Sequence, residues 1–289
     1  MTVGTLFALG RVSNLPTVWT NVLAAAVLSG ATHEPLAIVS TALALSSFYC
    51  GGMFLNDAFD RELDAVERPD RPIPSGLATA RQVFVLGILQ LAFGVLALSA
   101  TARACGSSPG LALASGAVLA GTIVAYDASH KRNPFAPWIM GLCRALVYIC
   151  AAATLTNEPR WPTVLIAAFA LTAYTAGVTY VARVETTGRA SRAWPLALMA
   201  VAPLVIVTEA GLYTAIVPLA IFASWSVPAL SRAFRSTAPD VPGAVTRAIA
   251  AMCLLDAAWA WVGGAHSVAA IAALGLPLTR FAQRRVAGT

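Results

Sequence analysis

The chain has 289 residues, of which 58% are hydrophobic and only 11% are charged. This composition and a mean hydropathy of +0.74 exclude an ordinary soluble domain, in which about a quarter of the residues are charged. The net charge is +6, but the arginines that produce it lie between apolar segments, so we attribute them to membrane orientation and expect no nucleic acid partner.

Long apolar runs follow one another along nearly the whole chain, and each approaches the roughly 20 residues that a helix needs to cross a bilayer. Nine of them predict spanning helices, at residues 14–31, 36–55, 81–101, 110–126, 136–155, 162–182, 194–209, 212–230 and 245–262. A shorter apolar segment at 266–279 allows a tenth crossing. We therefore expect an all-α polytopic membrane protein, a single integral-membrane domain over residues 1–289, with about nine helices around a central cavity.

The loops between these segments alternate in charge, and this alternation predicts the orientation. Loops after the second, fourth, sixth and eighth segments carry clusters of basic residues, whereas the other loops are short. Basic loops stay on the cytoplasmic side of a membrane, so we expect the N-terminus and these loops in the cytoplasm, at the inner (plasma) membrane. Long loops often carry function, so we expect the cavity to open to this cytoplasmic face.

Six of the 13 acidic residues lie in one stretch, from Asp57 to Asp70, at the end of the second apolar segment. Asn56, Asp60 and Asp64 are four residues apart, so a helix that continues beyond the membrane would place them on one face. Asp57 would lie next to that face. Carboxylates that converge repel one another unless a cation lies between them, and oxygen ligands without histidine or cysteine suit Mg²⁺.

Arginines follow the acidic residues in the same loop. Arg68 and Arg71 suit the outer oxygens of a phosphate group, because a guanidinium can donate paired hydrogen bonds to it. Two prolines after Arg71 stiffen the loop, and Ser75 is a candidate N-cap for the helix that resumes near Thr79. The alternative is an ordinary solvated loop in which acidic and basic side chains merely pair.

The order Asn56-Asp57-x-x-Asp60-x-x-x-Asp64, followed by Arg71-Pro-x-Pro-Ser-Gly, resembles the first aspartate-rich motif of the UbiA superfamily of intramembrane prenyltransferases. Members of that family have about nine helices with polar loops on the cytoplasmic side, which agrees with the segments above across nearly the whole chain. The resemblance implies that Asp57, Asp60 and Asp64 bind Mg²⁺ and an isoprenyl diphosphate, with Asn56 assisting.

A second element follows the fourth apolar segment, in Tyr126-Asp-Ala-Ser-His-Lys131-Arg132. A tyrosine followed by a Lys-Arg pair is similar to another recurring element of that family, which implies that Lys131 and Arg132 hold the diphosphate and that Tyr126 lies near the reacting carbon. An orientation signal is the alternative for the basic pair. Asp127 and His130 are additional here; His130 could accept a proton from an acceptor, although a single loop histidine is more often inert.

Four of the polar residues inside the apolar segments are candidates for a role in the site or in helix packing. Arg144 is in a Gly-x-x-Arg sequence that the family often has, which implies a role beside the phosphate; snorkelling to the interface is the alternative. Asn14 and Asn21 share a helix face, so they point into the cavity or bond a neighbouring helix. Asp256 is a rare intramembrane acid, for which we expect a structural hydrogen bond rather than catalysis.

The sequence departs from the family at its second aspartate-rich motif, Asp-x-x-x-Asp, after the sixth segment. Glu185 is the carboxylate that remains there, between Arg183 and Arg189. Three readings stay open: Glu185 holds a second metal alone, the arginines neutralise the diphosphate in place of a metal, or this branch performs different chemistry. The departure argues against the quinone, haem and chlorophyll branches.

We therefore expect Mg²⁺-dependent transfer of an isoprenyl group from a polyprenyl diphosphate to an aromatic or other cyclic or polar acceptor. The residues expected to carry the chemistry are Asp60, Asp64, Tyr126 and Lys131; those expected to bind substrate are Asn14, Asn56, Arg68, Arg71, Lys131, Arg132, Arg144, Arg183 and Glu185; those expected to bind metal are Asp57, Asp60, Asp64 and Glu185. One alternative is a terpene cyclase or diphosphate lyase of the same superfamily. Another is a membrane transporter or lipid carrier, although transporters place charges near the bilayer midplane.

Overall fold

The computed structural model describes residues 1–31, 34–183, 193–234 and 239–286, and within these ranges it contains helices and no strands. A helix is present at each of the ten apolar segments. These helices are α2 (Leu15–Ser29), α3 (Pro35–Phe59), α5 (Ala80–Ala104), α6 (Pro109–Ser129), α7 (Ala136–Leu155), α8 (Trp161–Ala182), α9 (Trp194–Ala210), α10 (Leu212–Ser231), α11 (Val241–Val262) and α12 (His266–Gln283). The shorter elements are α1 (Val3–Leu9), η1 (Val12–Asn14), α4 (Arg61–Glu67) and η3 (Arg232–Phe234).

Seven segments in the described part of the chain are long and apolar enough to cross a bilayer: α3, α5, α6, α7, α8, α11 and residues 212–234, which include α10. Helix α9 is apolar but has 17 residues, and α2 has 15. The all-helical membrane fold is therefore confirmed, whereas length and composition support seven spans, and the expected number of nine stays a prediction.

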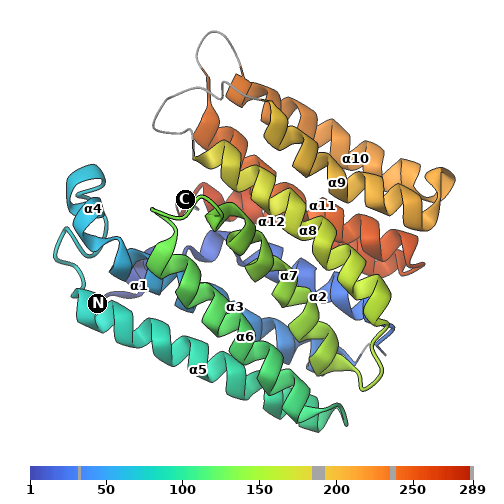
Figure 1. Cartoon of the computed structure of the whole chain (residues 1–289), viewed down its shortest axis with the longest axis horizontal. Coiled ribbons are helices and arrows are strands. Elements are labelled where there is room, and N and C mark those ends of the chain that lie inside the picture. Colours follow the sequence, from blue (N-terminus) through green and yellow to red (C-terminus); the bar gives the residue numbers. More distant parts are fainter. Residues whose placement is uncertain (32–33, 184–192, 235–238, 287–289) are drawn as a thin grey trace.

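The helices lie side by side, with α5 and α6 along one flank of the bundle and α9 and α10 along the other (Figure 1). Helix α3 packs against α5, α7 against α8, and α11 against both α12 and α2. The most apolar windows of α7, α8 and α11 are 61% to 72% buried, compared with 28% for α5 and α6. Helices α7, α8 and α11 thus lie at the centre of the bundle. The outer helices present apolar side chains that suit a lipid environment.

Glycines let α3, which carries the acidic stretch, lie close to α5. A Cβ added at Gly87 would come within 2.8 Å of the Leu55 side chain, and one at Gly51 would come within 2.9 Å of the Gly87 carbonyl oxygen. Small residues allow this close approach of helix backbones inside membranes. The close packing fixes the end of α3 relative to the rest of the bundle.

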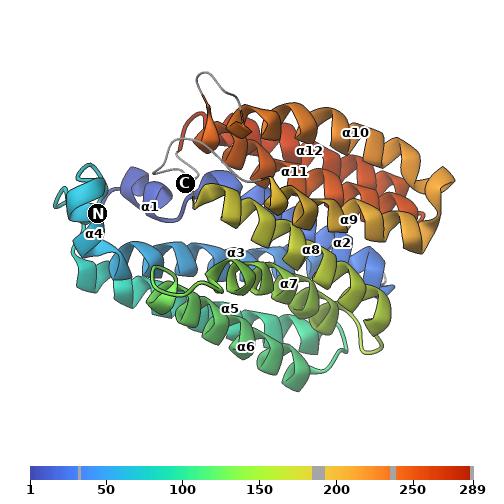
Figure 2. The same cartoon turned by 45° about the horizontal axis from the view of Figure 1, so that its top comes forward.

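We expected one helix to continue through the acidic stretch. Instead, α3 ends at Phe59 and a separate helix, α4, begins at Arg61. Asp60, between them, has φ −83° and ψ 0°. The amide nitrogens of Asp60 and Asp64 still donate to the carbonyl oxygens of Asn56 and Asp60, at 2.9 and 2.8 Å, so helical spacing survives the break. The short helices α1 and α4 lie together at one end of the bundle (Figures 1 and 2).

The helix after the acidic loop is capped differently from the expectation. Thr79, and not Ser75, is the N-cap of α5: its hydroxyl accepts from the Gln82 amide nitrogen, and the Gln82 side chain accepts from the Thr79 amide nitrogen. The Ser75 hydroxyl instead donates to the Arg71 carbonyl oxygen at 2.7 Å. Ser75 therefore stabilises the loop that carries Arg71.

Candidate active site

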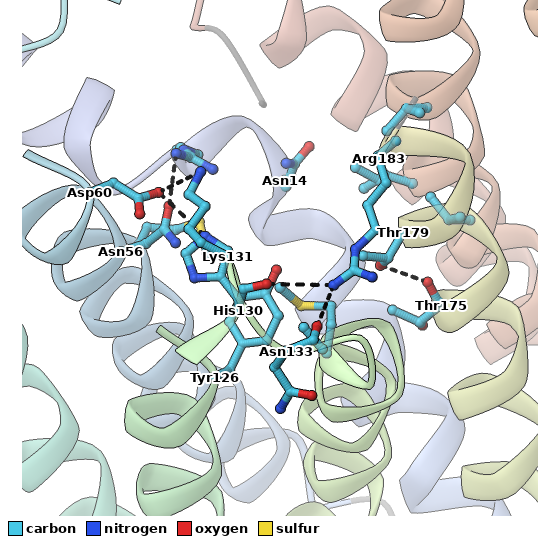
Figure 3. Close-up of a pocket in the computed structure, with 18 of the residues that line it drawn as sticks. Asn14, Asn56, Asp60, Tyr126, His130, Lys131, Asn133, Thr175, Thr179 and Arg183 are labelled. Carbon is cyan, nitrogen blue, oxygen red and sulfur yellow. Dashed lines mark hydrogen bonds and ion pairs between the residues drawn. The ribbon is translucent and has the colours of Figure 1, made fainter. Parts of the chain in front are cut away.

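A cavity of about 740 Å³ lies at the end of the bundle that carries α4, with walls from η1, α3, α4, α6, α7, α8 and α11. Side chains that are far apart in the sequence meet around it (Figure 3). The predicted site residues that line it are Asn14, Asn56, Asp60, Asp64, Arg68, Arg71, Tyr126, Lys131, Arg132, Arg144 and Arg183. Asp57 is buried at the edge of this group, and Glu185 and Arg189 lie outside the described residues.

One arginine joins two of the acidic residues. Arg71 Nη1 donates to Asp57 Oδ1 at 3.1 Å and to Asp64 Oδ2 at 2.7 Å. Arg11 Nη2 donates to the same Asp57 oxygen at 3.1 Å. The side chains of Asp57 and Asp64 are only 7% and 6% exposed. Because these carboxylates are largely removed from water, losing a partner would be costly, and the pairs hold the proline-containing loop against the end of α3.

Arg11 was not predicted as a site residue, yet it lines the cavity. It precedes η1 with φ 41° and ψ 47°, a left-handed conformation that is unfavourable for a residue other than glycine. Its Nη2 also reaches Asn56 Oδ1 at 3.4 Å. The sequence does single out Arg11 in one respect: among the first 33 residues it is the only one with a charged (Asp, Glu, Lys or Arg) side chain.

Asp60 faces the loop that follows α6. Its Oδ2 lies 3.2 Å from Lys131 Nζ and 3.4 Å from His130 Nε2, and the His130 ring stacks on Tyr126 with the centroids 5.0 Å apart. Burial acts to raise the pKa of Asp60, but the hydrogen bond and charge of His130 and the charge of Lys131 outweigh it and lower the pKa from its ordinary value. Asp60 is therefore ionised at neutral pH and suited to hold a cation.

Arg183, just after α8, holds the same loop from the other side. Its Nη2 donates to the carbonyl oxygens of Asn133 at 2.7 Å and His130 at 3.5 Å, and its Nη1 donates to that of Pro134 at 3.3 Å (Figure 3). Arg183 was expected to neutralise a diphosphate, and it does line the cavity. The carbonyl contacts add a second role, because they fix the loop that carries Lys131.

A hydrogen-bond network lies deeper in the bundle and joins α2, α7 and α11. Asp256 is fully buried and accepts hydrogen bonds from the hydroxyl groups of Thr20 and Tyr148, both at 2.5 Å. Asn21 Nδ2 donates to both oxygens of the same carboxylate, at 2.9 and 3.0 Å. The structural hydrogen bond expected of Asp256 is confirmed.

This network also positions Arg144. Arg144 Nη1 donates to Asn21 Oδ1 at 3.2 Å, and its guanidinium lies over the Tyr49 ring, 5.6 Å from the centroid. Asn21 therefore bonds neighbouring helices, whereas Asn14 lines the cavity, where it contacts Tyr49 and Gln283. Asn14 thus takes both of the roles left open, since it lines the cavity and bonds two other helices, whereas Asn21 bonds neighbouring helices.

The carboxylates at the cavity fit Mg²⁺ in type. Within the described residues, no group of three or more His, Cys, Asp or Glu side chains forms a ready metal site. Each ion pair uses one oxygen of Asp60 or Asp64, which leaves a second oxygen of each for a cation. Mg²⁺ commonly takes one or two carboxylates and shares substrate phosphates, and this pattern suits Asp60 and Asp64. A metal role for Asp57, whose Oδ1 serves two arginines, stays a prediction.

The cavity carries an excess of positive charge. Among the described residues its walls contain seven basic side chains and three carboxylates. The basic ones are Arg11, Arg68, Arg71, Lys131, Arg132, Arg144 and Arg183, and the acidic ones are Asp60, Asp64 and Glu67. Asp57, at the edge of the cavity, pairs with two of these arginines, so the excess is three positive charges. A concave site of this kind attracts a compact, multiply charged anion.

Comparison with known proteins identifies the family. The profile of the UbiA prenyltransferase family matches residues 15–241, which is most of the chain. The chain belongs to this family. The resemblance carried by the motif around Asp60 and Asp64 is thereby confirmed.

This UbiA family member also resembles individual curated proteins. It is 36% identical over 86 residues to the digeranylgeranylglyceryl phosphate synthase of Methanothrix thermoacetophila, a match that covers 30% of this chain and 31% of that one. It is 34% identical over 107 residues to the protein of the same name from Natronomonas pharaonis, covering 37% and 35% of the two chains. The chain thus spans about a third of the length of the curated relatives it matches.

Two solved structures share the fold of this UbiA family member. One, described for digeranylgeranylglyceryl phosphate synthase in membranes, has a TM-score of 0.55 at 17% identity and covers 96% of this chain and 94% of that one. The other is an apo UbiA homolog from Aeropyrum pernix, with a TM-score of 0.52 at 15% identity, covering 95% and 97%. At these identities the likeness shows the fold alone.

Proposed function

We propose that this protein transfers an isoprenyl group from an isoprenyl diphosphate to a small cyclic or otherwise polar acceptor at the membrane. The observation that supports this most directly is the cavity in which Asp60, Asp64 and Lys131 line one space with an excess of basic side chains. Membership of the UbiA prenyltransferase family supports the same activity.

In this proposal the basic side chains bind the diphosphate. Lys131 is 51% exposed, so its ammonium can turn from Asp60 to a phosphate oxygen. Arg68 and Arg132 also line the cavity. The bond between C1 of the isoprenyl chain and the diphosphate oxygen breaks, and both electrons leave with the diphosphate, whose charge these residues stabilise. Mg²⁺ held by Asp60 and Asp64 would supply further stabilisation of the same charge.

The allylic carbocation is then captured by the acceptor. Tyr126 lies where the main cavity meets a smaller apolar pocket, so its ring can stabilise a cation at that point. A nucleophilic atom of the acceptor forms the new bond to C1 and loses its proton. The apolar tail of the substrate would lie among the helices, which is why the reaction belongs in a membrane.

We also propose that the cavity faces the cytoplasm and that the relatives indicate the first substrates to test. Loop charges support a cytoplasmic position for the end of the bundle that holds the cavity, as expected for an inner-membrane protein. The curated relatives are digeranylgeranylglyceryl phosphate synthases, and this makes geranylgeranyl diphosphate the first donor to test. Their name also adds a glyceryl phosphate to the acceptor classes.

The test measures diphosphate release from geranylgeranyl or farnesyl diphosphate with Mg²⁺, using protein purified into lipid nanodiscs. Asp60→Asn combined with Asp64→Asn should lower the release at least about 100-fold, because charge stabilisation of the leaving group is lost. Glu62→Gln is the matched control, since Glu62 is an acid of the same stretch whose side chain is 86% exposed.

Equal release by the wild type and the double variant would refute the proposed mechanism. A terpene hydrocarbon formed from the donor without an acceptor would instead favour a cyclase or lyase. Binding of the donor without any diphosphate release would favour a lipid carrier.

A further inference from the structure

A small apolar pocket lies beside the main cavity, between α2, α3, α6 and α7, and has a volume of about 90 Å³. This side pocket and the main cavity share Tyr49, Met53, Tyr126, Met140 and Arg144 in their walls. The rest of the side pocket is mainly aliphatic and aromatic. It is therefore suited to an apolar group that enters from the main cavity.

One carboxyl group lies in this apolar wall. Asp127 is only 4% exposed, and its Oδ1 accepts a hydrogen bond from Asn56 Nδ2 at 3.3 Å. Its Oδ2 is buried and has no hydrogen-bond partner among the described residues. Native structures seldom leave such an atom unsatisfied, because its desolvation is unfavourable. Rotation about the Cβ–Cγ bond of aspartate is soft, so a ligand in the side pocket can supply the missing partner.

The surroundings of Asp127 select the kind of group that can donate to it. Arg144 lines the same pocket and is held in place by Asn21, so its positive charge would repel an ammonium group. A hydroxyl group is neutral and donates one hydrogen bond. The chemistry of the pocket therefore favours an alcohol.

The volume of the side pocket limits the size of that alcohol. A cavity of about 150 Å³ holds benzene, so a pocket of about 90 Å³ is too small for a whole aromatic ring. It has room for an aliphatic fragment of a few carbon atoms. Any larger part of the acceptor must remain in the main cavity.

We infer that the side pocket binds the hydroxyl-bearing end of an aliphatic alcohol acceptor, and that Asp127 Oδ2 accepts the hydrogen bond from that hydroxyl. The inference rests on the proposed prenyl transfer and makes its product an ether. The hydroxyl oxygen forms a bond to C1, the diphosphate leaves with the electron pair of the broken C1–O bond, and the hydroxyl proton passes to the Asp127 carboxylate. Tyr126, in the wall shared with the main cavity, places C1 beside the pocket.

The variant that tests this is Asp127→Asn. Its side-chain oxygen can still accept from Asn56, and its volume is unchanged, but the amide nitrogen that replaces Oδ2 donates and cannot accept. With geranylgeranyl diphosphate and 1-butanol, the measurement is the ratio of geranylgeranyl butyl ether to geranylgeraniol, the product of capture by water. This ratio does not depend on how fast the diphosphate ionises.

For the wild type we expect ether formation that saturates with 1-butanol, and for Asp127→Asn a butanol concentration for half-saturation at least about tenfold higher. Gly52→Ala tests the pocket separately, because its added Cβ would approach Ile123 Cγ2 to 3.0 Å. It should lower the ether ratio for 1-butanol more than for methanol. Benzyl alcohol should form less ether than 1-butanol, and Glu62→Gln should match the wild type.

An ether ratio unchanged in Asp127→Asn and in Gly52→Ala would overturn the inference, and so would diphosphate release without saturable ether formation in the wild type. If the wild type releases no diphosphate, the proposed function fails. Saturation-transfer NMR of 1-butanol with the same proteins then decides the side pocket by itself. Binding that is weakened in Asp127→Asn supports the pocket, and equal binding or no binding refutes it.

Discussion

Replacing Arg71 with methionine removes a side chain that joins Asp57 and Asp64. Breaking a buried ion pair by deleting one partner costs about 3–5 kcal/mol. Asp57 keeps Arg11 at 3.1 Å, so the main loss falls on Asp64, and we expect a value near the lower limit, about 3 kcal/mol. For a chain of this size, that corresponds to a fall in Tm of roughly 6–12 °C.

Thermal unfolding in detergent, followed by tryptophan fluorescence, measures this effect. Arg61→Met is the matched control: Arg61 pairs with Glu62 at 2.9 Å, but their side chains are 51% and 86% exposed, and such surface pairs contribute about 0–1 kcal/mol. The second comparison combines Arg71→Met with Asp64→Asn, which removes the charge that would otherwise be left buried and unpaired.

If the ion pair is the cause, the combined variant should be more stable than Arg71→Met alone. Destabilisation that is simply additive in the combined variant would refute this reasoning, because independent sites add whereas paired residues do not. So would a fall in Tm for Arg61→Met as large as that for Arg71→Met.

Three further predictions concern the membrane interior, the rim of the cavity and the metal. Asp256→Leu leaves the donors of Thr20, Tyr148 and Asn21 without their acceptor. At about 0.6 to 1.7 kcal/mol per interhelical bond, the free energy of SDS-induced unfolding should fall by roughly 2–5 kcal/mol. Asp256→Asn should lower it less. Arg183→Met frees the loop that carries Lys131, so the KM for geranylgeranyl diphosphate should rise about tenfold. Arg183→Lys should give an intermediate KM. An unchanged KM would contradict a positioning role for Arg183. EDTA should abolish diphosphate release and excess Mg²⁺ should restore it; release that persists in EDTA would leave charge neutralisation to the basic side chains alone.

The positions of the helices could be predicted from the sequence because each spanning helix requires a long apolar run, and all ten runs became helices. The break at Asp60 could not be predicted in this way. Asp60 and Arg61 are neither glycine nor proline, and the side-chain partners of Asp60 are His130 and Lys131, about seventy positions away. A helical spacing rule considers near neighbours and contains no information on such contacts.

The motifs predicted which residues meet at the cavity, but not how they pair. Asp57 belongs to the acidic motif, yet its partners Arg11 and Arg71 occupy the space beside its Oδ1. Arg11 precedes the first apolar segment by only a few residues, where a basic side chain reads as an ordinary orientation signal. In the sequence, Asp127 is only an additional residue within a basic motif. Its burial beside an apolar pocket could not be predicted, because that pocket forms where four helices pack together.

The loop between α6 and α7 connects the two sides of the cavity. On one side Asp60, at the end of α3, contacts Lys131 and His130; on the other, Arg183 beyond α8 donates to carbonyl oxygens of the same loop. Among the described residues, the end of α8 thus places Arg183 at this rim, where the family pattern has carboxylates. Arg183 supplies a positive charge and holds the loop that carries Lys131. Because Arg183 is fixed by carbonyl groups that carry no charge, its positive charge is not cancelled, and it remains available to the anion that the cavity attracts.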